Sequence, residues 1–341
     1  MRTSFLFLAA LAACGGGSSG NPIDAAVTID GPLAGADAAD GAATGDAARP
    51  GGGILFIAKS PAGPGNGDPA VWDGVIEERI ATNGAAPTPL TGIAREAVHD
   101  PASVVYRAAG PEILVGNRHG NNAADGTAGS IDRFTYDPAT GALVQGTPIT
   151  GNGLAGVHQV AISPTTGELF AANVGAGISR FTVAGDVFSA NGTISTGLAR
   201  GVMVSPSGAT LWVSDTSSSI RVFDLATGVE GTPVTVGGPT KNFHFFAVRE
   251  GELYVAALDT DEVYRFPIGT DDVLGTPTAI AAPSPIAIAF SQDGGEMYVT
   301  GHRDTFVISR FTYQASDDSW QPGTELTSTI SLGGITMAPT E

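Results

Sequence analysis

One short segment recurs along the chain at a nearly constant spacing. In each copy a polar turn leads into an apolar run, and these runs begin at steps of 42, 42 and 44 residues, at Leu169, Leu211, Leu253 and Met297. An earlier copy at Ile113 lies 56 residues before the first of these, so its unit carries an insertion. A period of about 40 to 45 residues is typical of propeller blades, which bury their faces only against further copies. The period therefore predicts a ring of repeated units.

Each copy continues into further strand signatures. An apolar residue followed by Arg and Phe, with small variations, stands at 131–134, 178–181, 220–223, 263–266 and 308–311, and Gly-Thr-Pro follows at 146–148, 231–233 and 275–277. Proline is acceptable in an outer strand because its missing N–H breaks no ladder hydrogen bond there. Each copy is therefore expected to form a four-stranded antiparallel blade. One repeat position is Arg in four blades, which predicts packing between blades by Arg133, Arg180, Arg265 and Arg310.

The two ends of the repeated region complete each other. Residues 333–339 match the first strand of a blade, and residues 53–58 match a second strand with no first strand before it. We therefore expect an all-β fold, a β-propeller of six four-stranded blades, whose ring is closed by pairing of the C-terminal strand with the N-terminal blade. Seven blades is the alternative. The expected blades are 53–90 with the C-terminal strand, 98–150, 157–196, 200–236, 244–280 and 285–331.

The first residues predict export. Arg2 precedes an apolar stretch, 5–11, that is too short to span a bilayer, and Leu-Ala-Ala then precedes Cys14. This ending resembles the bacterial lipobox, which implies that residues 1–13 are a signal peptide and that Cys14 is acylated. An ordinary signal peptide with a chance cysteine is the alternative. We expect a cell-envelope protein anchored in a membrane through Cys14, in the outer membrane of a Gram-negative bacterium, on its periplasmic or its surface face.

Composition separates a linker from the repeated domain. Residues 14–52 are mostly Gly, Ala, Ser and Asp, which bury too little apolar surface to offset the entropy of ordering, so we expect a flexible tether before a propeller domain at 53–341. Only 15% of the residues are charged, while 48 are Gly and 22 are Pro, which favours short strands and turns. The net charge of −18 argues against a nucleic-acid partner.

Two repeat units carry a family resemblance. Residues 157–181, beginning Val-His-Gln-Val-Ala-Ile-Ser-Pro, and residues 200–228, beginning Arg-Gly-Val-Met-Val-Ser-Pro, resemble repeats of the YVTN and lactonase β-propeller superfamily. The resemblance extends over most of 98–331 and implies a propeller, with hydrolysis of a cyclic ester, as in 6-phosphogluconolactonases, as a possible activity. Its motifs are those of a blade, and a fold alone does not assign a function.

The aligned blades place polar residues at one face of the central channel. Three candidate catalytic residues, His158, Arg200 and His244, stand at the start of the inner strand in their blades. Further candidates for ligand binding stand near the starts of inner strands or the ends of second strands, and they are His99, Asn117, His119, Asn173, Asp215, His302 and Arg303. Convergent polar groups in a pocket are the default hypothesis for a site.

Three interpretations of this pocket remain open. The leading one is binding without chemistry, in which a monomer offers a polar channel mouth to a small molecule, a glycan or a protein. The alternative is lactone hydrolysis, in which a histidine acts as base on water and Arg200 stabilises the oxyanion. The third is a divalent metal held by His158 and His244 with Asp215 or Asn173, but no closely spaced ligand motif supports it, and we expect no cofactor.

Overall fold

The computed structural model describes residues 53–60, 73–81, 88–89, 97–99, 101–118, 129–139, 142–302, 307–327 and 331–339. The expected signal peptide, Cys14 and the tether lie outside the described residues, as do His119 and Arg303. In this part of the chain no helix is long and apolar enough to cross a membrane. Its secondary structure is almost entirely antiparallel β-strand.

The described strands form six sheets, of which the first three follow. The first sheet contains β1 (Gly53–Ser60), β2 (Asp73–Ala81), β3 (Thr88–Pro89), β4 (Ala97–His99) and β26 (Ser331–Pro339). The second contains β5 (Pro101–Arg107), β6 (Glu112–Asn117), β7 (Ser130–Tyr136) and β8 (Leu143–Gln145). The third contains β9 (Val157–Ile162), β10 (Leu169–Asn173), β11 (Gly177–Ala184) and β12 (Val187–Ile194).

The remaining three sheets repeat the same order. The fourth contains β13 (Gly201–Val204), β14 (Thr210–Ser214), β15 (Ser219–Asp224) and β16 (Val234–Thr235). The fifth contains β17 (Phe243–Arg249), β18 (Glu252–Ala257), β19 (Glu262–Pro267) and β20 (Thr278–Ala281), with the short 3-10 helices η2 (Leu258–Thr260) and η3 (Thr270–Asp272) in its loops. The sixth contains β21 (Pro285–Phe290), β22 (Glu296–Gly301), β23 (Val307–Gln314), β24 (Ser319–Pro322) and β25 (Leu326–Thr327).

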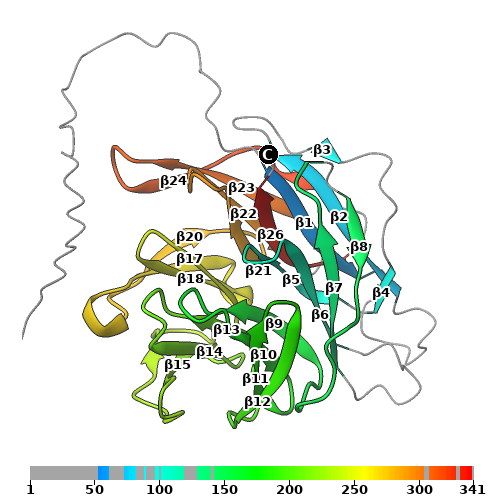
Figure 1. The fold of residues 1–341 in the computed structure, drawn as a ribbon. Helices are drawn as coiled ribbons and strands as arrows, with labels where there is room; N and C mark the ends of the chain where they lie inside the picture. Colours follow the sequence, from blue (N-terminus) through cyan, green and yellow to red (C-terminus); the bar gives the residue numbers. More distant parts are fainter. Residues whose placement is uncertain are drawn as a thin grey trace, which may run out of the picture. The chain divides into compact units, whose positions relative to one another are not determined.

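One strand from the inner edge of each sheet takes part in a closed ring. Going round, these strands are β5, β9, β13, β17, β21 and β26, and each contacts the next until β26 meets β5 again. Figure 1 shows β26 (dark red) beside β1 (blue), although they come from opposite ends of the described chain. The prediction of an all-β propeller closed by the C-terminal strand is confirmed.

Two details of the expected blades differ in the structure. Four sheets contain four strands, but the first and the sixth contain a fifth, because β4 pairs with β2 and β25 pairs with β23. The residues of β4 thus belong to the first sheet, and the second sheet begins at Pro101 instead of residue 98. The described residues form no seventh sheet.

The hydrophobic core lies between neighbouring sheets. Along β1, Ile54 and Phe56 pack with residues of the second sheet such as Val104, whereas Leu55 and Ile57 pack in a cluster that includes Tyr298 of the sixth sheet. Alternate residues of a strand point to opposite faces, so a strand between two packed sheets must be apolar at every position. This requirement explains the unbroken apolar runs that mark the repeats.

The repeated arginines pair mainly within their own sheets. Arg133, Arg180, Arg265 and Arg310 each form an ion pair with a glutamate at or just before the start of the neighbouring second strand, and these partners are Glu112, Glu168, Glu252 and Glu296. Two of the arginines also reach the next sheet: Arg133 donates to the Asp186 carbonyl at 3.1 Å, and Arg265 pairs with Asp318 at 2.5 Å. The expectation of packing between blades is therefore met by Arg133 and Arg265, and all four arginines also pair with a glutamate of their own sheet.

Candidate functional site

The starts of the inner strands lie beside the ends of the second strands at one end of the channel, which we call the mouth. The register pairs Pro101 with Asn117, Val157 with Asn173, Gly201 with Ser214, Phe243 with Ala257 and Pro285 with Gly301. The repeat alignment thus places the candidate residues of these two groups at a common end of the ring.

A β-bulge interrupts the start of most inner strands. His158 and Gln159 of β9 lie opposite the single residue Ala172, and His244 and Phe245 of β17 lie opposite Ala256. Comparable register shifts occur in β5, β21 and β26, whereas the register of β13 is continuous. A bulge bends a strand and redirects its side chains, and such bulges are over-represented next to active sites. Both candidate histidines are bulge residues.

His158 is half-buried and has a defined hydrogen bond. Its Nδ1 lies 3.0 Å from the Gly156 carbonyl oxygen, and because a carbonyl only accepts, Nδ1 must be the donor. In the neutral ring the lone pair then resides on Nε2. A histidine with its tautomer fixed in this way has the arrangement of a general base that acts near neutral pH.

Arg200 stands at the mouth, where the charge of a second arginine acts on it. Burial, and to a smaller extent the positive charge of Arg118, lower the pKa of the half-buried Arg200 guanidinium below its usual value. Arg118 follows β6, while Arg200 precedes β13, and a whole sheet separates them along the ring. Within the described residues, Nε of Arg200 is buried without a hydrogen-bond partner. A guanidinium N–H without a partner, in a region of positive charge, favours an anion or a developing negative charge beside it.

His244 is much less accessible than the other two candidate catalytic residues, since only 4% of it is exposed. Its carbonyl accepts a hydrogen bond from Ser214 Oγ at 2.5 Å, and the same oxygen of Ser214 accepts one from the Gly201 N–H at 2.8 Å. A Cβ at Gly201 would overlap the His244 carbonyl oxygen, so only glycine permits this approach of β13 to β17. His244 thus belongs to the wall of the mouth.

Two of the expected ligand-binding residues are fully buried. Asn173 donates to the carbonyls of Ala171 and Gly177 at 3.1 Å and to Ser179 Oγ at 3.0 Å, and its side-chain oxygen accepts the Ala155 N–H at 3.1 Å. Asn117 donates to Ser130 Oγ at 3.2 Å. These amides hold strand ends together, so their placement does not support ligand contact.

The other expected residues occupy the rim or lie outside the described side chains. Asp215 is half-buried and accepts the Ser217 N–H at 3.2 Å, which caps a turn. His302 is half-buried, and its backbone N–H donates to the Ser284 carbonyl. The backbone of His99, in β4, pairs with that of Asp73, in β2. No three His, Cys, Asp or Glu side chains of the described residues gather as possible metal ligands.

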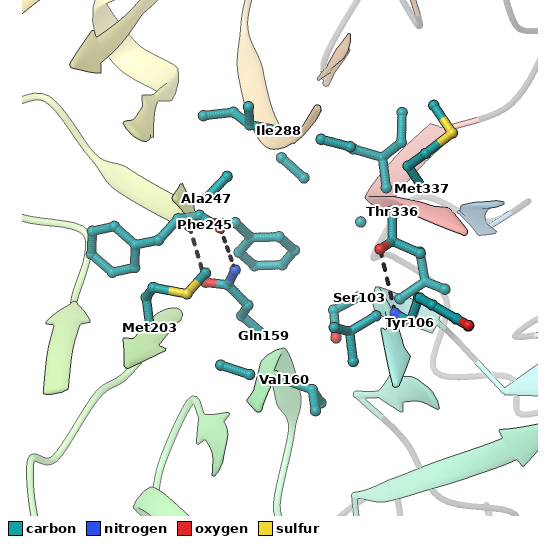
Figure 2. A pocket seen from close by; sticks show the side chains of 18 of the residues that line it. Ser103, Tyr106, Gln159, Val160, Met203, Phe245, Ala247, Ile288, Thr336 and Met337 are labelled. Atoms are coloured by element: carbon teal, nitrogen blue, oxygen red, sulfur yellow. Dashed lines mark hydrogen bonds between the residues drawn. The ribbon is translucent and has the colours of Figure 1, made fainter. Parts of the chain in front are cut away.

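A separate cavity of about 370 Å³ lies in the channel itself. Figure 2 shows its lining, which is mostly apolar and includes Val160, Met203, Phe245, Ile288 and Met337 from five inner strands. Gln159 also lines this cavity, but His158, Arg200 and His244 do not. The interior of the channel is therefore mostly apolar, and the three candidate catalytic residues lie outside this cavity.

The ring of antiparallel sheets defines the chain as a β-propeller, and comparison with solved structures agrees. No family model and no curated protein matches the chain. A periplasmic gluconolactonase of Pseudomonas aeruginosa, PpgL, is 16% identical with a TM-score of 0.58, over 81% of this chain and 84% of that one. A putative 6-phosphogluconolactonase of Bacteroides uniformis is 15% identical with a TM-score of 0.55, over 81% and 84%. A chain of a nidogen/laminin complex is 13% identical with a TM-score of 0.56, over 84% and 98%.

These similarities establish the fold alone. At such low identities a shared fold carries no conclusion about function. The repeat alignment found His158, Arg200 and His244, but it missed Arg118 and Gln159. Arg118 stands directly between two named candidates, Asn117 and His119, so its position next to a predicted strand end was the available signal.

Proposed function

We propose that this protein is a lactone hydrolase whose active site is the mouth of a propeller with six blades, one per sheet. The observation that carries the proposal is the half-buried Arg200, whose Nε has no hydrogen-bond partner within the described residues, at the mouth to which β9 contributes His158. The names of the first two solved neighbours described above, a gluconolactonase and a putative 6-phosphogluconolactonase, support the choice of a lactone as substrate.

The chemistry follows from the three side chains. His158 takes a proton from water through Nε2, and the water oxygen bonds to the lactone carbonyl carbon. The carbonyl oxygen becomes an oxyanion, which the Arg200 guanidinium stabilises, with Arg118 adding positive charge. When the intermediate collapses, the bond between the carbonyl carbon and the ring oxygen breaks, and the proton on His158 passes to that oxygen. The product is an open hydroxy acid, whose carboxyl group releases its proton to solvent, and the resulting carboxylate lies beside the arginines.

An assay of the hydrolysis of glucono-δ-lactone and of its 6-phosphate, measured through the acid that is released, tests this proposal. His158→Gln should lower kcat by about 10² to 10⁴-fold, because the base is lost. Arg200→Met should lower kcat by about 10² to 10³-fold, because a donor to the oxyanion is lost. Arg180→Met is the matched control, since Arg180 pairs with Glu168, which precedes β10 at the end of the sheet opposite the mouth. The proposal fails if wild-type protein does not exceed the spontaneous rate. It also fails if His158→Gln and Arg200→Met are as active as the wild type and the control.

Binding without turnover is the second candidate, and the same two arginines favour it, because they attract an anion whether or not His158 acts. Calorimetry with gluconate as probe separates the two functions. Binding lost in Arg200→Met and Arg118→Met, with no hydrolysis by wild type, would assign a binding protein.

We also propose that the chain is a lipoprotein of the cell envelope, anchored through Cys14. The resemblance of residues 11–14 to the lipobox supports this location. Cys14→Ser should release the protein from the membrane fraction, and mass spectrometry of wild-type protein should find the lipid mass on Cys14. Wild-type protein without lipid, together with an unchanged distribution of the variant, would exclude the anchor.

A further inference from the structure

The side chain of Gln159 crosses the ring to two other sheets. Its amide nitrogen donates to the Phe246 carbonyl at 2.7 Å, and its amide oxygen accepts the N–H groups of Phe246 and Val202, both at 3.0 Å. Gln159 is 7% exposed, and the partner groups belong to β17 and β13. Figure 2 shows the amide directed toward β17, with its hydrogen bonds to Phe246 dashed.

The amide replaces a missing strand at the inner edge of the ring. β13 and β17 are the inner strands of their sheets, so the edge facing the channel has no neighbouring strand to satisfy its N–H and C=O groups. An amide side chain carries both a donor and an acceptor, and it pairs with Phe246 as a peptide group of another strand would.

The partner atoms stand next to the residues of the proposed active site. Gln159 follows His158 in the same bulge, Val202 comes two residues after Arg200, and Phe246 comes two residues after His244. Gln159 therefore ties together the three inner strands that carry these residues.

We propose that Gln159 is a positioning residue that holds His158, Arg200 and the wall residue His244 in their productive arrangement, an inference that rests on the proposed function. The bulge makes such a tie necessary, because it leaves the start of β9 outside the regular ladder. Displacement of a reacting group by about 1 Å can cost about 10²-fold in rate.

Three variants separate positioning from general stability. Gln159→Met keeps the length of the side chain and removes all three hydrogen bonds. Gln159→Glu keeps the acceptors, and it regains the donor to the Phe246 carbonyl only when its carboxyl is protonated. Gln145→Met is the matched control, because Gln145 is exposed on the outer strand β8.

The first measurement is independent of activity. In nitrogen-15 spectra of the histidine rings, Gln159→Met should shift the His158 and His244 signals and leave the His302 signal in place. Gln145→Met should leave all three signals in place. Unchanged His158 and His244 signals in a folded Gln159→Met protein would overturn the positioning role, whatever the fate of the lactonase proposal.

The second measurement uses hydrolysis of glucono-δ-lactone. Gln159→Met should lower kcat by about 10²-fold with little change in KM. The rate of Gln159→Glu relative to wild type should rise as the pH falls, because burial raises a carboxyl pKa and the neutral acid restores the donor. A pH-independent ratio would overturn the proposal. If wild-type protein is inactive but Gln159→Met shifts the His158 and His244 signals as expected, the lactonase function is rejected and the positioning role is retained.

Discussion

Single side chains at the start of the second strands connect the strands of one sheet electrostatically. Glu112 of β6 is the clearest case, because it pairs with both Arg107 and Arg133, and all three side chains are largely buried. Arg107 and Arg133 also lie over the ring of Phe188 in the third sheet. A buried carboxylate between two guanidinium groups is costly to remove, because both cations are then left without compensation.

Glu112→Leu should therefore lower the free energy of unfolding by about 3–5 kcal/mol. Glu230 provides the control, since it pairs with Arg221 in a similar geometry but its side chain is 38% exposed. Glu230→Leu should cost less than about 1 kcal/mol, because solvent screens an exposed pair. Urea denaturation of both variants measures the difference. Equal losses would mean that burial does not determine the strength of these pairs.

At the scale of elements, the sequence predicts strands well and bulges poorly. The apolar runs predicted β6, β10, β14, β18 and β22, because a strand buried on both faces requires an apolar residue at every position. The bulges at His158 and His244 leave no such trace, because an extra residue opposite one partner depends on the register between strands and not on residue type.

For the candidate site, the sequence predicted the positions of residues but not the interactions between distant sheets. The repeat alignment placed His158, Arg200 and His244 at one end of the ring, because equivalent positions of a repeat occupy equivalent positions in space. It could not find the effect of the Arg118 charge on Arg200 or the hydrogen bond of Gln159 with Phe246. These interactions join sheets that are not neighbours, and a linear period contains no information about interactions across the ring.

At the scale of the whole molecule, one strand pair closes the ring. β26 pairs with β1 along most of its length and also contacts β5 and β21. Deleting residues 331–341 should expose the inner edge of β1 and open the ring, so that the cooperative thermal transition is lost or moves far below that of wild type. Deleting residues 15–50, the expected tether, should leave the melting temperature nearly unchanged. Similar small losses for both deletions would contradict closure by β26.

The position of β26 in the chain also bears on biosynthesis. β1 is the first described strand and β26 the last, so a ribosome completes nearly the whole chain before the strand that pairs with the inner edge of β1 exists. At about 5–20 residues per second the edge of β1 waits for roughly tens of seconds. A chain that folded during synthesis would expose this edge to aggregation throughout that time. For a chain exported before it folds, the same delay keeps the ring open until transport is complete.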